Sequence, residues 1–286
     1  MNDIILKCKN LTKIYKVKKR QILALNHISF EIKKGIVFGI IGPNGSGKTT
    51  LFKILMGMIK RFDGEFEILG SRNGKNIKVK EKIGFLPEQP AIYPDLNAYE
   101  ALKFYASFFN DKNISRKDYI YDLIKQVGLY EHRKKKVREY SKGMMQRLSI
   151  AQAIINNPDL LILDELTSGL DPFVTEEINE IILNLKKQGK TIVISSHLLG
   201  HIQDISDVIG VLYKGKLLKI GTIKEITQVK EKGVAVFDTM GKTIQECASL
   251  FKNTPLPVTS VDYLENDLEA AFKQIVNEEI ENEKNS

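Results

Sequence analysis

The chain has 286 residues, of which 43% are hydrophobic, and its formal net charge is +8. This length suits one large domain or a main domain with an appendage, and the hydrophobic share suffices for a substantial core. No apolar run approaches the length that spans a bilayer, and no signal-peptide pattern opens the sequence, so we expect a soluble cytoplasmic protein. Cys8 and Cys247 have no paired spacing, which argues against a disulfide framework or a cysteine metal site.

The charge is unevenly distributed along the chain. Lysines crowd residues 7–20, residues 133–138 form a basic run, and residues 277–283 are acidic. A basic run can bind nucleic acid, but it more often forms a solvated loop. We therefore expect no nucleic-acid partner.

The first 35 residues predict strands and turns. Residues 4–6 open a strand, and residues 25–32 alternate apolar and polar, which is typical of a half-buried antiparallel strand. Tyr15 lies between these segments. It is either an ordinary tyrosine on a sheet surface or an aromatic plate for a purine base.

A glycine-rich stretch at residues 42–49 follows the apolar run 36–41 and precedes a predicted helix. It fits the pattern G-x-x-x-x-G-K-[ST], and the strand–loop–helix context favours a phosphate site over a plain glycine turn. Glycines let successive backbone N–H groups point at an anion, and the helix start adds its positive dipole. Lys48 would reach the β- and γ-phosphates, and the Thr49 hydroxyl would ligate Mg²⁺.

The middle of the chain predicts a helical insertion at about residues 90–156. It follows a strand at 64–70, a lysine-rich surface loop at 71–82 and a strand at 83–87. Residues 97–109 and 119–129 have helical spacing. A third helix runs to about Asn156, with Ser141 as its N-cap, and its start would offer free N–H groups to an anion.

Residues 160–163 predict a strand, and their wholly apolar character is typical of a parallel sheet. Two acidic residues, Asp164 and Glu165, follow at its carboxyl end. They could cap the next helix and face water, but open α/β sheets bind ligands at this edge. With a phosphate loop in the chain, we favour Asp164 as a holder of Mg²⁺ and Glu165 as the group that orients or deprotonates water. The buried strand 191–195 leads to His197 at the same edge, which favours a functional histidine over a structural one.

The character of the sequence changes beyond residue 221, after a predicted hairpin at 208–220. Candidate strands at 234–237 and 258–261 and an amphipathic helix at 264–276 predict a small α+β appendage with a frayed acidic tail. We therefore divide the chain into a main domain, residues 1–225, and an appendage, residues 226–286.

The order of these motifs resembles that of the ATP-binding cassette (ABC) ATPases, over residues 3 to about 222. The resemblance implies an α/β P-loop NTPase core with an antiparallel β subdomain and a helical insertion. It implies two ATP sites, each built from both halves of a dimer. It also implies Tyr15 on the adenine, Glu165 as the catalytic carboxylate, and Lys48 and His197 at the γ-phosphate.

The implied site residues fall into four groups. ATP would contact Tyr15, Gly42, Pro43, Asn44, Gly45, Ser46, Gly47, Lys48, Thr49 and Thr50. Mg²⁺ would be held near Thr49, Asp164 and either Glu88 or Gln89. The signature that closes on the nucleotide of the second subunit would be Ser141, Lys142, Gly143 and Met144. The loop that crosses the interface would be Ser168, Gly169, Leu170 and Asp171.

Departures from the family pattern favour its exporter-type branch, which includes antibiotic and peptide exporters. The signature has Tyr140, Lys142 and Met144 in place of the usual residues, and Leu166 stands where proline is usual. The resemblance implies a separate membrane permease subunit, expected to contact residues 92–109, and a peripheral location at the cytoplasmic face of the membrane. The alternative is a soluble ABC ATPase acting on ribosomes or DNA, but the chain lacks the second cassette or long coiled coil usual there.

Overall fold

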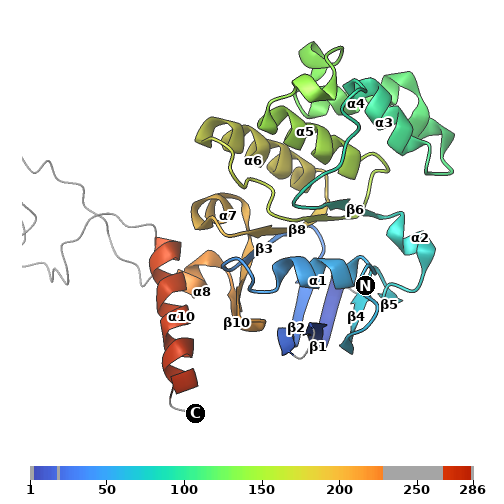
Figure 1. The fold of residues 1–286 in the computed structure, drawn as a ribbon. Helices are drawn as coiled ribbons and strands as arrows, with labels where there is room; N and C mark the ends of the chain where they lie inside the picture. The colour runs from blue at the N-terminus through green and yellow to red at the C-terminus, as the bar shows by residue number, and fades with distance from the viewer. Residues whose placement is uncertain (1–2, 18–19, 228–266, 285–286) are drawn as a thin grey trace, which may run out of the picture.

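The computed structural model describes residues 3–17, 20–227 and 267–284 and has two sheets with a helix between them (Figure 1). The larger sheet has six strands in the order β10-β9-β3-β8-β7-β6. Its strands are parallel except for β10 at one edge. Their bounds are β3 Val37–Ile41, β6 Ile83–Leu86, β7 Leu160–Leu163, β8 Thr191–Ser196, β9 Val208–Tyr213 and β10 Lys216–Gly221.

The smaller sheet is antiparallel and has the order β2-β1-β4-β5. Its strands are β1 Ile4–Val17, β2 Arg20–Lys33, β4 Asp63–Ile68 and β5 Ser71–Arg72. The alternation predicted for residues 25–32 is confirmed from Ile28 to Ile32, where every second residue is buried, whereas two residues separate Ile28 from buried Leu25 at a register shift of the strand. This face of the sheet is therefore the one that packs on the core.

Helix α1, Lys48–Leu55, fills the space between the two sheets. Its buried side chains Leu51, Phe52 and Ile54 share one apolar cluster with Phe30 of β2 and Phe38 of β3, whose rings stack 5.5 Å apart. The helix start is thus fixed close to the carboxyl end of β3, separated from it in the chain by the glycine loop.

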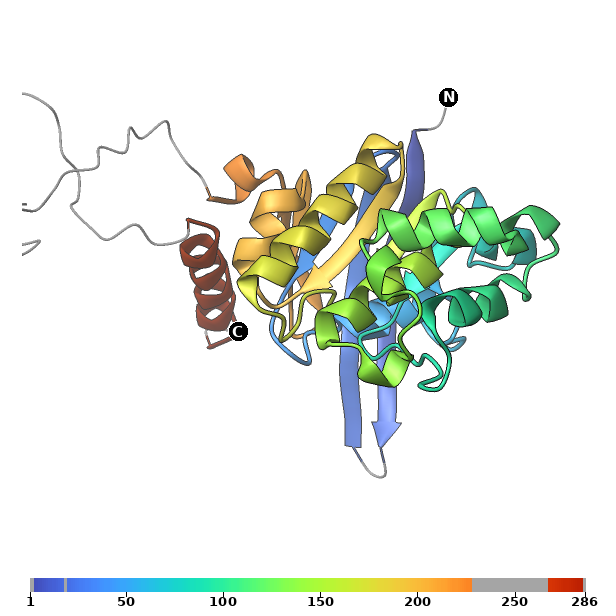
Figure 2. The same cartoon turned by 90° about the horizontal axis from the view of Figure 1, so that it is seen from above.

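Helices cover the other face of the six-stranded sheet, and the predicted helical insertion lies to one side of it (Figure 2). The insertion contains α3 Ala98–Ala106, α4 Lys117–Gln126 and α5 Lys142–Ala153, with short 3-10 turns η1 Lys112–Ser115, η2 Tyr130–His132 and η3 Val137–Glu139. Helices α6 Pro172–Lys187 and α7 Leu199–Ile205 complete the layer. The first turn of α3 is closed by a capping box between Asn97 and Glu100, and the Asn97 N–H lowers the pKa of the Glu100 carboxyl.

The C-terminal helix α10, Asp267–Lys284, packs against β10, α7 and α8, Ile223–Thr227. Leu268 is fully buried in the main core, and Glu279 pairs with Lys216 of β10 at 2.5 Å. The tail that the sequence predicted to be frayed is helical in α10 as far as Lys284, and the Glu279 contact lies within it. The two strands expected in the appendage fall outside the described residues.

The lysine-rich stretch 71–82 is not only a loop, because it contains β5 and the one-turn helix α2, Ile77–Lys80. The basic run 133–138 makes contacts within the chain: Arg133 lies over the Tyr130 ring at 3.9 Å, and Arg138 pairs with Asp95 at 2.9 Å. Within the described ranges, no helix combines the length and apolar character needed to cross a membrane.

Replacing Ile120 with alanine tests how the helical insertion is held. Ile120 of α4 is fully buried in the main core cluster. Ile120→Ala should lower the free energy of unfolding by about 2–5 kcal/mol, since it removes packed methyl groups and leaves a cavity. Urea denaturation measures the loss. Lys125→Ala, an exposed position on the same helix, should change it little; equal losses would show that α4 is not packed as described.

Candidate active site

The glycine loop between β3 and α1 has a backbone that only glycine accommodates without strain. Gly45 and Gly47 have φ angles of 80° and 113°, in the left-handed region. A Cβ atom on Gly42 would lie 2.1 Å from the Leu212 carbonyl oxygen. Gly47 is the N-cap of α1 and makes no side-chain cap, so no side chain competes there for the first N–H groups of the helix. The loop therefore has the curled, glycine-dependent backbone expected of the predicted phosphate site, and anion binding by it stays a prediction.

Contacts from the β9–β10 hairpin, distant in the sequence, hold this loop in place. The Gly215 N–H, in the turn between β9 and β10, donates to the Ser46 carbonyl at 2.9 Å. The Gly215 carbonyl in turn accepts from the Asn26 N–H of β2 at 2.8 Å. The loop is thus tied to both sheets through one glycine.

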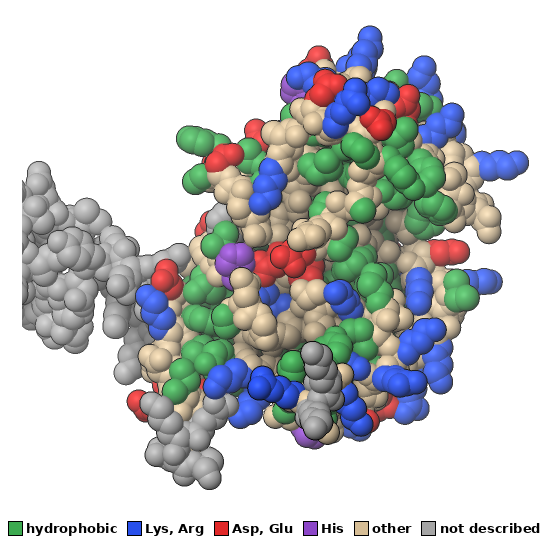
Figure 3. Space-filling model, viewed as in Figure 1, with side chains coloured by type: hydrophobic (Ala, Val, Ile, Leu, Met, Phe, Trp, Pro, Cys, Tyr) green, Lys and Arg blue, Asp and Glu red, His purple; other side chains and the backbone are tan. Residues whose placement is uncertain are grey.

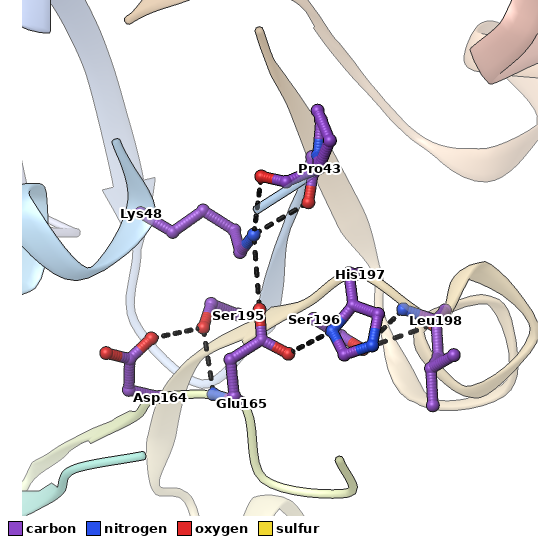
Figure 4. Close-up of polar contacts among 9 residues, drawn as sticks. Pro43, Lys48, Asp164, Glu165, Ser195, Ser196, His197 and Leu198 are labelled. Carbon is purple, nitrogen blue, oxygen red and sulfur yellow. Dashed lines mark hydrogen bonds and ion pairs between the residues drawn. The ribbon is translucent and has the colours of Figure 1, made fainter. Parts of the chain in front are cut away.

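Lys48 is buried with its charge satisfied from three sides (Figure 4). Its side chain is 5% exposed, and its Nζ donates to the carbonyls of Gly42 at 2.6 Å and Pro43 at 3.2 Å. The Oε1 atom of Glu165 lies 3.1 Å from the same Nζ. The Glu165 carboxylate therefore supplies the negative charge beside Lys48 that a phosphate would supply in a nucleotide complex.

Glu165 is fixed between Lys48 and His197. Its Oε2 lies 2.6 Å from the Nδ1 of His197, and its carboxylate is only 7% exposed. Its φ of 50° is left-handed, a conformation that costs a non-glycine residue about 1–2 kcal/mol. This turn points the side chain back toward the glycine loop. The three residues assigned to catalysis from the sequence thus form one cluster, in which an ion pair joins Glu165 to Lys48 and a hydrogen bond joins it to His197.

Asp164 is 1% exposed and directly follows β7, beside β8. Its Oδ1 accepts a hydrogen bond of 2.6 Å from the Ser195 hydroxyl, and the same oxygen of Ser195 accepts the Glu165 N–H at 3.0 Å. No functional role was predicted for Ser195 from the sequence. The signal that could have found it is a hydroxyl side chain two residues before His197 on a buried strand that neighbours Asp164.

The donors near the loop suit Mg²⁺, because a carboxylate and a hydroxyl are hard oxygen ligands. Thr49 is the second residue of α1, and Asp164 directly follows β7. No group of three or more His, Cys, Asp or Glu residues in the part of the chain that the structure describes is placed to hold a metal ion. The chain therefore offers a partial set of ligands that phosphate oxygens would complete.

Three residues predicted for the site do not join this cluster. Glu88 and Gln89 are exposed after β6, whose last carbonyl, that of Leu86, accepts the Asp164 N–H at 2.8 Å. Which of the two approaches the metal stays open. Tyr15 pairs with Ile22 on the β1–β2 hairpin and lies under the Lys13 ammonium group, 4.9 Å from the ring centroid. Its role at adenine stays a prediction.

The signature residues and the interface loop meet each other at the starts of α5 and α6. The Ser141 hydroxyl accepts the Met144 N–H at 3.2 Å, which confirms the predicted N-cap. Asp171 caps α6 in the same way, through Val174 at 3.0 Å. A Cβ atom on Gly143 would lie 2.4 Å from Val174, and one on Gly169 would lie 2.5 Å from the Lys142 ammonium. These close approaches join the two segments into one surface.

Comparisons with known proteins place these motifs in context. A family model described as ABC transporter matches residues 25–168. The lantibiotic transport ATP-binding protein SrtF of Streptococcus pyogenes is 41% identical over 214 residues, which cover 75% of this chain and 89% of SrtF. The bacitracin transport ATP-binding protein BcrA of Bacillus licheniformis is 40% identical over 217 residues, 75% of this chain and 69% of BcrA.

Solved structures agree with this likeness. A dimeric ATP-binding cassette in a post-hydrolysis state, bound to ADP and Pi, superposes with a TM-score of 0.69 at 30% identity, covering 76% of this chain and 98% of that one. The chain spans less than two thirds of the length of two further relatives: the match covers 62% of an uncharacterized ABC transporter ATP-binding protein of Synechocystis, at 41% identity, and 66% of one of Nostoc, at 39%. The names of these relatives refer to neither ribosomes nor DNA.

Removing the Lys48 charge tests the buried pair. Lys48→Met would leave the Glu165 carboxylate buried without its cation, so the free energy of unfolding should fall by about 3–5 kcal/mol. Denaturant titration measures it. Lys7→Met is the control. It breaks the ion pair of Lys7 with Glu31, in which the two side chains are 50% and 45% exposed, and should leave the denaturation midpoint almost unchanged. Similar midpoints for the two variants would contradict the described burial.

Proposed function

This chain belongs to the ABC transporter family of ATP-binding subunits, and from that membership we propose that it binds and hydrolyses ATP to drive a separate membrane subunit of an exporter. The observation that carries the proposal is the cluster of Lys48, Glu165 and His197 under the glycine loop. It brings a cation for phosphate, a carboxylate for water and a hydrogen-bonding imidazole to one point.

ATP binding would replace the Glu165 carboxylate beside Lys48 with phosphate oxygens. The loop N–H groups and the start of α1 receive the phosphates, and Lys48 leaves Glu165 for the β- and γ-phosphate oxygens. Bound Mg²⁺ would neutralise charge on the phosphates as a Lewis acid, held by the Thr49 hydroxyl and, directly or through water, by Asp164. The exchange frees the Glu165 carboxylate from its cation.

Hydrolysis would then use the freed carboxylate. Glu165 orients a water molecule and takes its proton as the water oxygen attacks the γ-phosphorus in line with the departing ADP oxygen. His197 holds the Glu165 side chain from the other side, which limits the orientations of the carboxylate. Lys48 and the loop N–H groups stabilise the charge that develops on the transferred phosphoryl group.

A second copy of this chain, or a related subunit, would complete each site. Ser141 and Gly143 start α5 with N–H groups, and the interface loop 168–171 lies against them. Support comes from the ADP- and Pi-bound relative, which is a dimer. The chain carries one copy of each motif, so a monomer would bind nucleotide but hydrolyse it poorly.

Export is the direction that the relatives support. SrtF and BcrA are named for the transport of a lantibiotic and of bacitracin, and a third relative, LnrL of Bacillus subtilis, for linearmycin resistance. We propose a peripheral position at the cytoplasmic face of the membrane. The membrane subunit, not this chain, would select the substrate.

A cluster of exposed aromatic rings is the proposed contact for that membrane subunit. Tyr93, Phe104 and Phe108 are 57%, 37% and 69% exposed. The Phe104 ring lies 5.2 Å from that of Tyr93 and 5.0 Å from that of Phe108, measured between centroids. Hydrophobic side chains gather on this end of the molecule (Figure 3). A patch of large apolar side chains on a water-soluble surface marks an interaction site, and the position agrees with the segment 92–109 expected from the sequence.

The Glu165→Gln variant tests the catalytic assignment. It keeps the shape of the side chain but cannot accept the water proton. ATP binding should persist, the dimer should accumulate, and kcat should fall by roughly 10²–10⁴. Phosphate release and size-exclusion chromatography with ATP measure these effects. Glu176→Gln, an exposed carboxylate of α6, is the matched control; rapid turnover by Glu165→Gln would defeat the assignment.

A double variant tests the membrane contact. Phe104→Ser with Phe108→Ser should weaken binding to washed membranes of the source cells by roughly tenfold or more, because it removes the central rings of the cluster. ATP binding should stay unchanged. Sedimentation of the labelled chain with the membranes measures binding, and Ile77→Ser, 74% exposed on α2, is the control. Unchanged sedimentation of the double variant would place the contact elsewhere.

A further inference from the structure

A buried serine links the two acidic residues of the site. Ser195 is fully buried near the end of β8, and its hydroxyl is the only side-chain group described as bonding both to Asp164 and to the Glu165 backbone. From this geometry we propose that Ser195 is a positioning residue for ATP hydrolysis, which orients the Asp164 carboxylate toward the metal and fixes the turn that aims Glu165.

The placement follows from strand register. Strands β7 and β8 are parallel, with Leu163 opposite Ile194, so Asp164 and Ser195 come next on the two strands. Side chains alternate along a strand, and Val193 and Ile162 both face α1. Ser195 and Asp164, each two residues further, therefore point to that same face, where the glycine loop lies.

The Ser195 hydroxyl donates one hydrogen bond and accepts another. It donates to Asp164 Oδ1 at 2.6 Å, which leaves the other carboxylate oxygen, Oδ2, without this bond. It accepts the Glu165 N–H at 3.0 Å. A carboxylate oriented by such a neighbour presents a chosen oxygen to a metal, and loss of this kind of support typically costs 10–100-fold in metal affinity or activity.

The second bond acts on Glu165. The left-handed φ of 50° at this residue is unfavourable for glutamate, and a hydrogen bond to its N–H helps to hold the backbone there. The same turn places the carboxylate between Lys48 at 3.1 Å and His197 at 2.6 Å. Ser195 thus acts through both acids without touching the substrate itself.

This inference rests on the proposed ATPase function, and its test separates the two. Ser195→Ala should bind ATP in EDTA with the affinity of the unaltered chain. The Mg²⁺ concentration for half-maximal hydrolysis should rise roughly tenfold and kcat should fall roughly 10–100-fold, with KM for ATP changed much less. Ser195→Thr keeps the hydroxyl and should recover most of both losses. Calorimetric titration of ATP with and without Mg²⁺ gives a readout that does not depend on turnover.

Thr191→Val is the matched control for a lost buried hydroxyl. Thr191 lies on the same face of β8 at its other end, is 1% exposed, and accepts the Gly35 N–H at 3.0 Å. The Thr191→Val variant should have a lower free energy of unfolding but an unchanged kcat and an unchanged Mg²⁺ concentration for half-maximal hydrolysis. If Ser195→Ala fails to fold, Ser195→Cys, whose thiol is a weak donor, should lie below Ser195→Thr in kcat.

Two results would overturn the inference. One is a Ser195→Ala chain with the kcat and Mg²⁺ midpoint of the unaltered chain, and the other is equal kinetic losses in Ser195→Ala and Thr191→Val. Failure of the unaltered chain to hydrolyse ATP would instead defeat the proposed function. In that case, the Mg²⁺ dependence of ATP binding would still test Ser195.

Discussion

A buried lysine must have negative or carbonyl oxygens around it, and this constraint organises the centre of the molecule. Lys48 meets it with two loop carbonyls and the Glu165 carboxylate. Because His197 holds the other oxygen of Glu165, the ends of β3, β7 and β8 are joined through side chains as well as through the sheet. The atoms that stabilise this buried cluster are therefore the same ones that would do the chemistry, so binding and structure are coupled.

Much of this arrangement could be predicted from local patterns. The glycine loop was recognisable because an apolar strand precedes it and a helix follows. Asp164 and His197 could be placed together because wholly apolar strands belong to parallel sheets, whose carboxyl ends lie at one edge. The N-cap at Ser141 also depends only on nearby residues. In each case, the information lies within a few residues of the feature.

The features that sequence did not predict depend on contacts between distant segments. The role of Ser195 depends on its contact with Asp164, which lies on another strand. The left-handed backbone of Glu165 cannot be predicted from the residue type, because glutamate rarely adopts it. The acidic tail was expected to fray, but helix α10 runs through it to Lys284, and Glu279 pairs there with Lys216 of β10. Such pairings become visible only when the strands and helices have been placed in space.

The tie between the glycine loop and Gly215 has a consequence for how the protein is made. The loop motif is complete by Thr49, yet Leu212 and Gly215, which confine and anchor it, are synthesised much later. Contacts of such large sequence separation form slowly, because the intervening chain must first be closed into a loop. A nascent or truncated chain that ends before β9 would therefore carry the full motif without the surroundings that shape it, and nucleotide competence would appear only when the chain is long enough to close the hairpin.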